Sequence, residues 1–187
     1  IDPEFKKSYC GIASETYSCA PDPIQRAAVV AYQNDAQTAQ YLQQQRQILS
    51  KIGNSFAETL RQGGIQVHNP EGGFYLYVDF TPFKAQANAA GMQTSEQLCV
   101  KLLQETGVAL LHSAAFGIPG EYLSARLAYV DFGGTKTEEN AEAMLAEMRA
   151  GANADAVVQK YAQHAMQGAQ RLAEWAAATA KGQQKAA

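Results

Sequence analysis

The sequence predicts an α+β fold of the α/β family, with a long interdomain helix, a small mixed or antiparallel sheet covered by helices, and a C-terminal helical extension. Three observations support this. Residues 23–62 are nearly free of helix breakers, residues 65–80 have the pattern of two strands around a glycine-rich turn, and residues 151–187 are rich in Ala and Gln. With 187 residues, 47% hydrophobic and 18% charged, the chain can form one domain with a helical appendage.

The first helical segment is expected over residues 23–62, with a break near Asn34-Asp35. Asp22 suits its N-cap and Pro23 its first turn, while Gly63-Gly64 would end it. The part after the break, about 25 residues long, is longer than most globular helices and is therefore expected to bridge two domains. It carries an apolar stripe at helical spacing: Leu42, Ile48, Leu49, Ile52, Phe56 and Leu60.

Two strands are expected next, Ile65–His68 and Phe74–Phe80, joined by a turn over residues 69–73. Within the second strand, large residues alternate on both faces: Phe74, Leu76 and Val78 on one, and Tyr75, Tyr77 and Asp79 on the other.

A short helical stretch from Pro82 to Ala90 follows. The next helix would be capped by Thr94 or Ser95 and end at Gly107. Its inward residues are predicted to be Leu98, Leu102 and Leu103.

Further strands are expected at Val108–Leu111, which would be buried, and at Leu123–Phe132. Thr137 would then cap a helix over Glu138–Arg149. Beyond Gly151 the pattern predicts one amphipathic terminal helix, and residues 181–187 are expected to fray. Its apolar face would include Val157, Tyr161, His164, Leu172 and Trp175.

Composition argues against several classes of function. The net charge is −3 and the basic residues are scattered, which disfavours nucleic acid as a partner. No apolar run approaches the roughly 20 residues of a membrane-spanning helix, so no membrane partner is expected. Three cysteines without paired spacing, Cys10, Cys19 and Cys99, fit a reducing compartment and hence a cytoplasmic location. No metal-ligand spacing is present in the sequence, and no metal is expected.

One arginine stands out. Arg126 interrupts the apolar strand Leu123–Val130, and a buried guanidinium is costly unless it is paired. Two readings are open: an ion pair with Glu121 or Asp131, or a two-pronged grip on a ligand carboxylate.

Four motifs occur in a characteristic order. They are Glu71–Asp79 (EGGFYLYVD), Leu103 followed by Gly107-Val108-Ala109, Phe116-Gly117, and Arg126. Together with the leader Tyr17–Gln25, they resemble the C-terminal third of class I and II aminotransferases of the aspartate aminotransferase fold (fold type I), over about residues 14–149.

The resemblance implies a pyridoxal-phosphate (PLP) enzyme, a homodimer when intact, that moves an amino group between an amino acid and a 2-oxo acid. It implies that Arg126 binds the substrate α-carboxylate, that Phe116 lines the substrate pocket, and that Ser18 approaches the cofactor phosphate of the partner subunit. Two departures stand out. His112-Ser113 replaces the family's usual Pro-Gly, and Ser14 stands where aspartate-specific members have an arginine, so a strictly dicarboxylate substrate is not supported.

The resemblance also divides the chain. Residues 1–7 are expected to be a cloning remnant, 8–35 the end of the large domain with a leader helix, 36–150 the small domain, and 151–187 a helical extension. The family's Schiff-base lysine would lie upstream of Tyr17, outside this sequence. The chain is therefore expected to be a fragment without catalytic residues, neither retaining PLP nor turning over substrate.

Two alternatives belong to other classes of function. The chain could be the aminotransferase-like effector domain of a transcription regulator, because one fold hosts several functions. It could also be a helical interaction module, with the Tyr161–Trp175 face docking on a partner.

Overall fold

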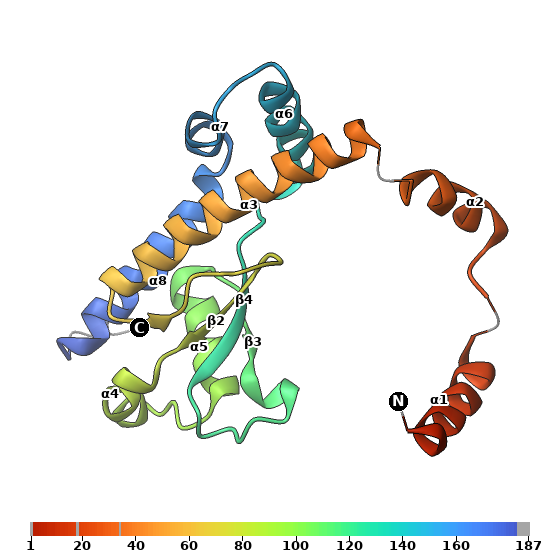
Figure 1. Ribbon diagram of the computed structural model, residues 1–187. Helices are drawn as coiled ribbons and strands as arrows, with labels where there is room; N and C mark the ends of the chain where they lie inside the picture. Colours follow the sequence, from red (N-terminus) through yellow and green to blue (C-terminus); the bar gives the residue numbers. More distant parts are fainter. Residues whose placement is uncertain (1, 18, 34, 183–187) are drawn as a thin grey trace. The chain divides into compact units, whose positions relative to one another are not determined.

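The computed structural model describes residues 2–17, 19–33 and 35–182 of the chain. By its internal contacts the chain divides into two compact units, Ile1–Leu42 and Gln43–Ala187. Most of the elements that bear on function lie in the second unit (Figure 1).

The first unit contains helices α1 (Pro3–Thr16) and α2 (Asp22–Ala31). The side chain of Asp2 caps α1 by accepting hydrogen bonds from the backbone of Glu4 and Phe5. Asp22 was expected to be the N-cap of α2 but is its first helical residue, and Pro21 occupies the N-cap position. Neither helix has a buried residue among those described.

Helix α3 (Ala36–Gln62) confirms the long helix and its apolar stripe. The buried positions recur at three- and four-residue intervals, as one face of a helix requires. They are Gln44, Ile48, Ile52, Gly53, Phe56, Ala57 and Leu60, whereas Leu42 and Leu49 are only partly buried.

The sheet in the second unit has four described strands in the order β1-β2-β4-β3, and every pairing is antiparallel. The strands are β1 (Gln66–Val67), β2 (Tyr75–Asp79), β3 (Leu111–His112) and β4 (Ser124–Ala128). The fold is thus α+β, and the sheet is antiparallel rather than mixed.

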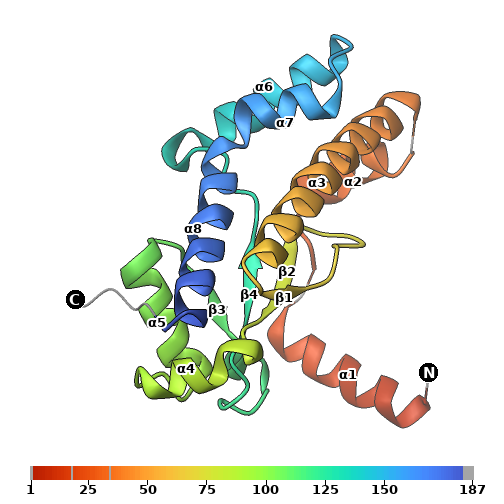
Figure 2. The same cartoon turned by 90° about the vertical axis from the view of Figure 1, so that its left-hand side faces the viewer.

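The two faces of this sheet differ in burial. Leu76 and Val78 of β2, with Ala125 and Leu127 of β4, are at most 2% exposed and form part of the core. Tyr75 and the other residues that alternate with them point to the opposite face. Helices α5 and α8 lie on one side of the sheet, as Figure 2 shows. The alternation of the second predicted strand therefore separates a packed face from an open one.

Two strand predictions need correction. The strand expected at Val108–Leu111 is β3 at Leu111–His112, and Leu111 is 37% exposed rather than buried. The strand expected at Leu123–Phe132 is paired only over Ser124–Ala128. β3 is an edge strand that pairs only with Arg126 and Ala125 of β4.

Helix α5 (Ser95–Thr106) has both predicted ends. Thr94 and Gln97 form a capping box, and Gly107 closes the helix in a left-handed conformation with φ 70°. Leu98 and Leu102 are fully buried, as expected. Leu103 is 50% exposed, so the prediction that it points inward was wrong. The short helix expected at 82–90 forms as a 3₁₀ turn η1 (Thr81–Phe83) followed by α4 (Lys84–Ala89).

The C-terminal region differs from the expected single helix. After η3 (Gly134–Lys136) come α6 (Thr137–Arg149), α7 (Ala154–Tyr161) and α8 (Gln163–Ala180). Thr137 is the first residue of α6 rather than its cap. Ala162 separates α7 from α8, and His164, which was expected on the apolar face, is exposed and pairs with Asp131. Residues 183–187 of the expected frayed tail lie outside the described part.

Helix α8 belongs to the core of the second unit. Its buried positions are Ala165, Gly168, Ala169, Leu172, Ala173, Ala176 and Thr179. Trp175 packs edge-on against Phe80 at a ring separation of 6.2 Å, and its Nε1 donates to Glu105 Oε2 at 2.5 Å. Trp175 thus contacts Phe80, which follows β2, and Glu105 of α5, while the Tyr161 hydroxyl donates to Glu147 of α6.

No helix in the described part of the chain has the length and apolarity to cross a membrane.

Candidate functional site

Arg126 lies in the middle of β4, with Tyr77 opposite it on β2 and Leu111 opposite it on β3. Directly paired residues share a face, so these three side chains belong to the open face of the sheet. Arg126 itself is partly buried. The sheet therefore places the Arg126 guanidinium group on its open face, with Tyr77 and Leu111 as its cross-strand neighbours.

Two aromatic rings contact this guanidinium. Its carbon Cζ lies 4.2 Å from the centre of the Tyr75 ring and 5.2 Å from that of Phe116. Both distances fall within the range of cation–π attraction. We call these three residues, Tyr75, Phe116 and Arg126, the arginine cluster. The structure thus brings together the two residues, Arg126 and Phe116, that the sequence nominated for substrate binding.

Among the described residues, the guanidinium group of Arg126 has neither a hydrogen-bond nor an ion-pair partner. The acidic residues considered as partners do not supply one. Asp131 accepts hydrogen bonds from the backbone N–H groups of Gly133 and Gly134 and pairs with His164 Nδ1 at 3.3 Å. Glu121 is exposed. The structure therefore disfavours the ion-pair reading of Arg126.

The hydrogen bonds to Asp131 also change the pKa of its carboxyl group. The hydrogen bond from the Gly134 backbone, above all, lowers the pKa of Asp131 below 3.8, and the nearby His164 adds to this effect. The carboxylate is thus held as a structural anion at the end of β4, facing α8 rather than the arginine.

A second polar pair lies beside the cluster. The hydroxyl of Tyr77 and the hydroxyl of Ser124 are 2.7 Å apart, and either can donate. Ser124 is two residues before Arg126 on the same face of β4. This bond directs the Tyr77 ring along the sheet toward Ser124.

Phe116 reaches the cluster from a loop. β3 continues into the 3₁₀ turn η2 (Ser113–Phe116), which Gly117 ends with φ 79°. Ser113 Oγ donates to the carbonyl oxygen of Tyr122 at 3.1 Å, linking this loop to the start of β4. The segment His112-Ser113, which departs from the family's usual Pro-Gly, therefore still forms an ordered connection.

The cluster fits a carboxylate but not the aldehyde of pyridoxal phosphate, because it contains no amine that could form an imine. Three buried side-chain atoms lack hydrogen-bond partners in the described chain: Gln44 Oε1, Ser95 Oγ and His112 Nδ1. None of these atoms belongs to the arginine cluster. Ser18, nominated for the cofactor phosphate, lies outside the described residues.

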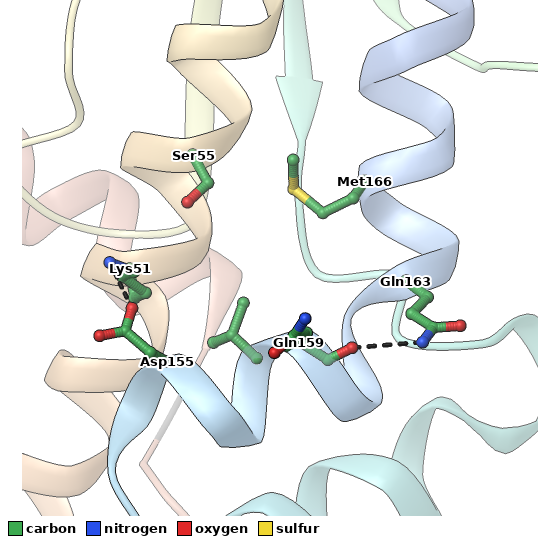
Figure 3. Close-up of a pocket in the computed structure, with 7 residues that line it drawn as sticks. Lys51, Ser55, Asp155, Gln159, Gln163 and Met166 are labelled. Atoms are coloured by element: carbon green, nitrogen blue, oxygen red, sulfur yellow. Dashed lines mark hydrogen bonds and ion pairs between the residues drawn. The ribbon is translucent and has the colours of Figure 1, made fainter.

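The structure also offers a groove between α3, α7 and α8 (Figure 3). Its charged groups, Lys51 and Asp155, pair with each other, and Gln163 donates to the carbonyl oxygen of Gln159. The described residues hold no cluster of His, Cys, Asp or Glu suited to a metal. The arginine cluster is therefore the better candidate for ligand binding.

An antiparallel sheet with helices on one side and an arginine on the other suits a domain that presents a carboxylate-binding group to a ligand. The sequence model of one family, "Aminotransferase class I and II", matches residues 2–143. The chain belongs to this family of transferases, whose members use pyridoxal phosphate. The match ends within α6, so α7 and α8 lie beyond it.

Relatives of known activity agree with this family. The chain is 30% identical over 128 residues to an asparagine–oxo-acid transaminase of Streptococcus mutans, a match covering 68% of this chain and 30% of that protein. It is 42% identical over 57 residues to an aspartate/prephenate aminotransferase of Cereibacter sphaeroides, covering 29% of this chain and 14% of that protein. The matches thus span less than a third of either relative's length.

Among solved structures, the aromatic aminotransferase from Pyrococcus horikoshii OT3 matches with a TM-score of 0.49 and 24% sequence identity. That match covers 67% of this chain and 31% of the other.

Proposed function

We propose that this chain is the C-terminal part of a PLP-dependent aminotransferase and that Arg126 binds the α-carboxylate of its amino-acid and 2-oxo-acid substrates. The observation that carries the proposal is the guanidinium group on the open sheet face, which has no acidic partner among the described residues. A guanidinium can donate two parallel hydrogen bonds to one carboxylate, and this fixes the ligand's orientation as well as its position.

In this proposal residues 36–150 form the small domain, residues 8–35 belong to the end of the large domain, and residues 151–187 extend the small domain. The lysine that would hold PLP would lie in sequence upstream of Tyr17. The intact enzyme would be a homodimer located in the cytoplasm. When bound, PLP would supply the electron sink for transamination. Arg126 would hold the substrate carboxylate, and Phe116 would form one wall beside it.

The proposal is tested on the longest reading frame that contains this sequence, produced as a protein and assayed for transamination. Arg126→Lys keeps the charge but loses the fork of paired donors, so kcat/KM for amino acids should fall by about tenfold or more. Arg46→Lys is the matched control, because Arg46 is exposed on α3. Unchanged kcat/KM in Arg126→Lys would refute the role of Arg126.

The chain as given provides a second test. After incubation with PLP and dialysis, we expect no cofactor absorption band above that of the protein, because the arginine cluster holds no amine. A band that survives dialysis and disappears on borohydride reduction would locate an imine-forming lysine in this chain and contradict the proposed division of the enzyme.

A further inference from the structure

We propose that Tyr75 and Phe116 are positioning residues for Arg126: their rings hold the guanidinium so that its N–H edge stays available to a ligand carboxylate. This inference rests on the proposed function, because it takes Arg126 to be the carboxylate-binding group. Tyr75 was not among the residues nominated from the sequence.

The register of β2 and β4 makes Tyr75 a neighbour of Arg126. Tyr75 pairs with Ala128 and Tyr77 pairs with Arg126, so Tyr75 is the diagonal neighbour of Arg126 on the same face. Diagonal neighbours lie about 7 Å apart, within reach of long and aromatic side chains. The 4.2 Å distance from Arg126 Cζ to the Tyr75 ring shows that the arginine leans along this diagonal.

Tyr77 belongs to a neighbouring diagonal pair of residues on the same two strands. Tyr77, which sits directly opposite Arg126, has its hydroxyl 2.7 Å from that of Ser124. Tyr77 and Ser124 form a diagonal pair with the same sense as Tyr75 and Arg126. The bond therefore ties the Tyr77 ring toward Ser124, and the arginine is left to contact Tyr75.

A second aromatic ring contacts Arg126 from a separate segment of the chain. Phe116 lies in η2, which follows β3, and its ring centre is 5.2 Å from Arg126 Cζ. Two rings from different parts of the chain thus restrict one side chain. An arginine that is already restricted loses less rotational freedom when it binds, and this favours the bound state.

Aromatic rings and a carboxylate approach a guanidinium group from different directions. An aromatic ring attracts a cation through its face, whereas a carboxylate accepts hydrogen bonds in the plane of the guanidinium at its N–H edge. Tyr75 is 42% and Phe116 48% exposed, so the cluster opens to the outside rather than closing over the arginine. Ring contact and carboxylate binding are therefore compatible on the same group.

The experiment follows the Arg126 Nε–H signal by NMR in the chain as given, while propionate is added at constant ionic strength and propionamide serves as the neutral control. Arg126→Lys identifies the signal by its loss. The variants are Tyr75→Leu, Tyr75→Phe, Phe116→Leu and, as a matched control, Tyr122→Leu, an exposed tyrosine with no ring contact to Arg126.

We expect Tyr75→Leu and Phe116→Leu each to weaken propionate binding by about two- to fivefold. The Nε–H signal of the free chain should also move, because the ring-current shift is lost. Tyr75→Phe should restore affinity and shift, and Tyr122→Leu should change neither. A purely structural role for Tyr75 would lower thermal stability without this rescue pattern.

Two negative outcomes have different meanings. If Tyr75→Leu and Phe116→Leu bind propionate as the wild type does, while Arg126→Lys loses binding, the positioning role is refuted and the carboxylate role of Arg126 stands. If propionate leaves the wild-type Arg126 signal unchanged, the proposed function fails and the positioning role falls with it. Should Tyr75→Leu fail to fold, Phe116→Leu alone decides.

Discussion

Gly63, just after α3, lies directly against the backbone of Ala173 in α8. A Cβ atom added at Gly63 would stand 2.5 Å from Ala173 Cα and 2.6 Å from its carbonyl oxygen. Contacts this short do not occur between real Cβ atoms and backbone, so the absence of a side chain lets these segments meet.

Gly63→Ala should therefore force α8 away from the end of α3 and destabilise the fold by about 1–3 kcal/mol, the usual cost of overpacking. Urea denaturation measures the change. Gly72→Ala is the matched control, because nothing lies within 4 Å of the added Cβ there. Equal stability of the two variants would mean that α8 does not pack at Gly63.

Leu172→Ala should lower the free energy of unfolding by about 2–5 kcal/mol, since Leu172 is fully buried on α8 and its truncation leaves a cavity. Gln167→Ala, at an exposed position of the same helix, should change it by no more than about 0.5 kcal/mol. Thermal melting of both variants checks this. A silent Leu172→Ala would favour the alternative in which the C-terminal helix serves a partner instead of this core.

The three cysteines should differ in reactivity. Cys99 is buried on α5, and burial raises its pKa to about 11, whereas Cys10 and Cys19 are exposed. At pH 8 only about one Cys99 in a thousand would be ionised, and the thiolate is the reactive form. A chromogenic thiol reagent should therefore modify two thiols in the native chain and three in denaturant. Rapid modification of all three without denaturant would contradict the packing of α5.

Asp131 should contribute stability that depends on pH. The fold lowers the pKa of Asp131, chiefly through the Gly134 backbone hydrogen bond, so the carboxylate stabilises the fold at pH values above its ordinary pKa. The contribution is lost as the pH falls through the folded-state pKa. Asp131→Ala should be less stable than the wild type near neutral pH, and the two stabilities should converge in acid. Glu121→Ala, at an exposed position, is the surface control and should differ little in stability from the wild type near neutral pH.

The periodicity of apolar residues in the sequence predicted those parts of the fold that depend only on which face of one helix or strand is buried. The stripe of α3 and the alternation of Leu76 and Val78 with Tyr75 and Tyr77 are both local patterns, and both are found. The prediction failed where two candidates compete for one face. Leu102 and Leu103 lie about 100° apart around α5, and the surface that packs against the helix buries Leu102 while leaving Leu103 half exposed.

The arginine cluster was predictable only in part. Motif order nominated Arg126 and Phe116 for substrate binding, and the structure places the two side chains close together. Tyr75 was missed because its contact depends on the register between β2 and β4, which the residues of either strand alone do not fix. The break at Ala162 was missed for a similar reason, since no proline or glycine marks it.

The alternation in β4 gives this short strand an unusual sensitivity to length. Inserting or deleting one residue at the start of β4, before Arg126, would slide the rest of the strand by one residue and exchange its two faces. Arg126 would then turn into the apolar layer, and a leucine or alanine would take its place among the rings. Substitution can adjust the open face gradually, but a change of length there would disrupt the core and the arginine cluster together.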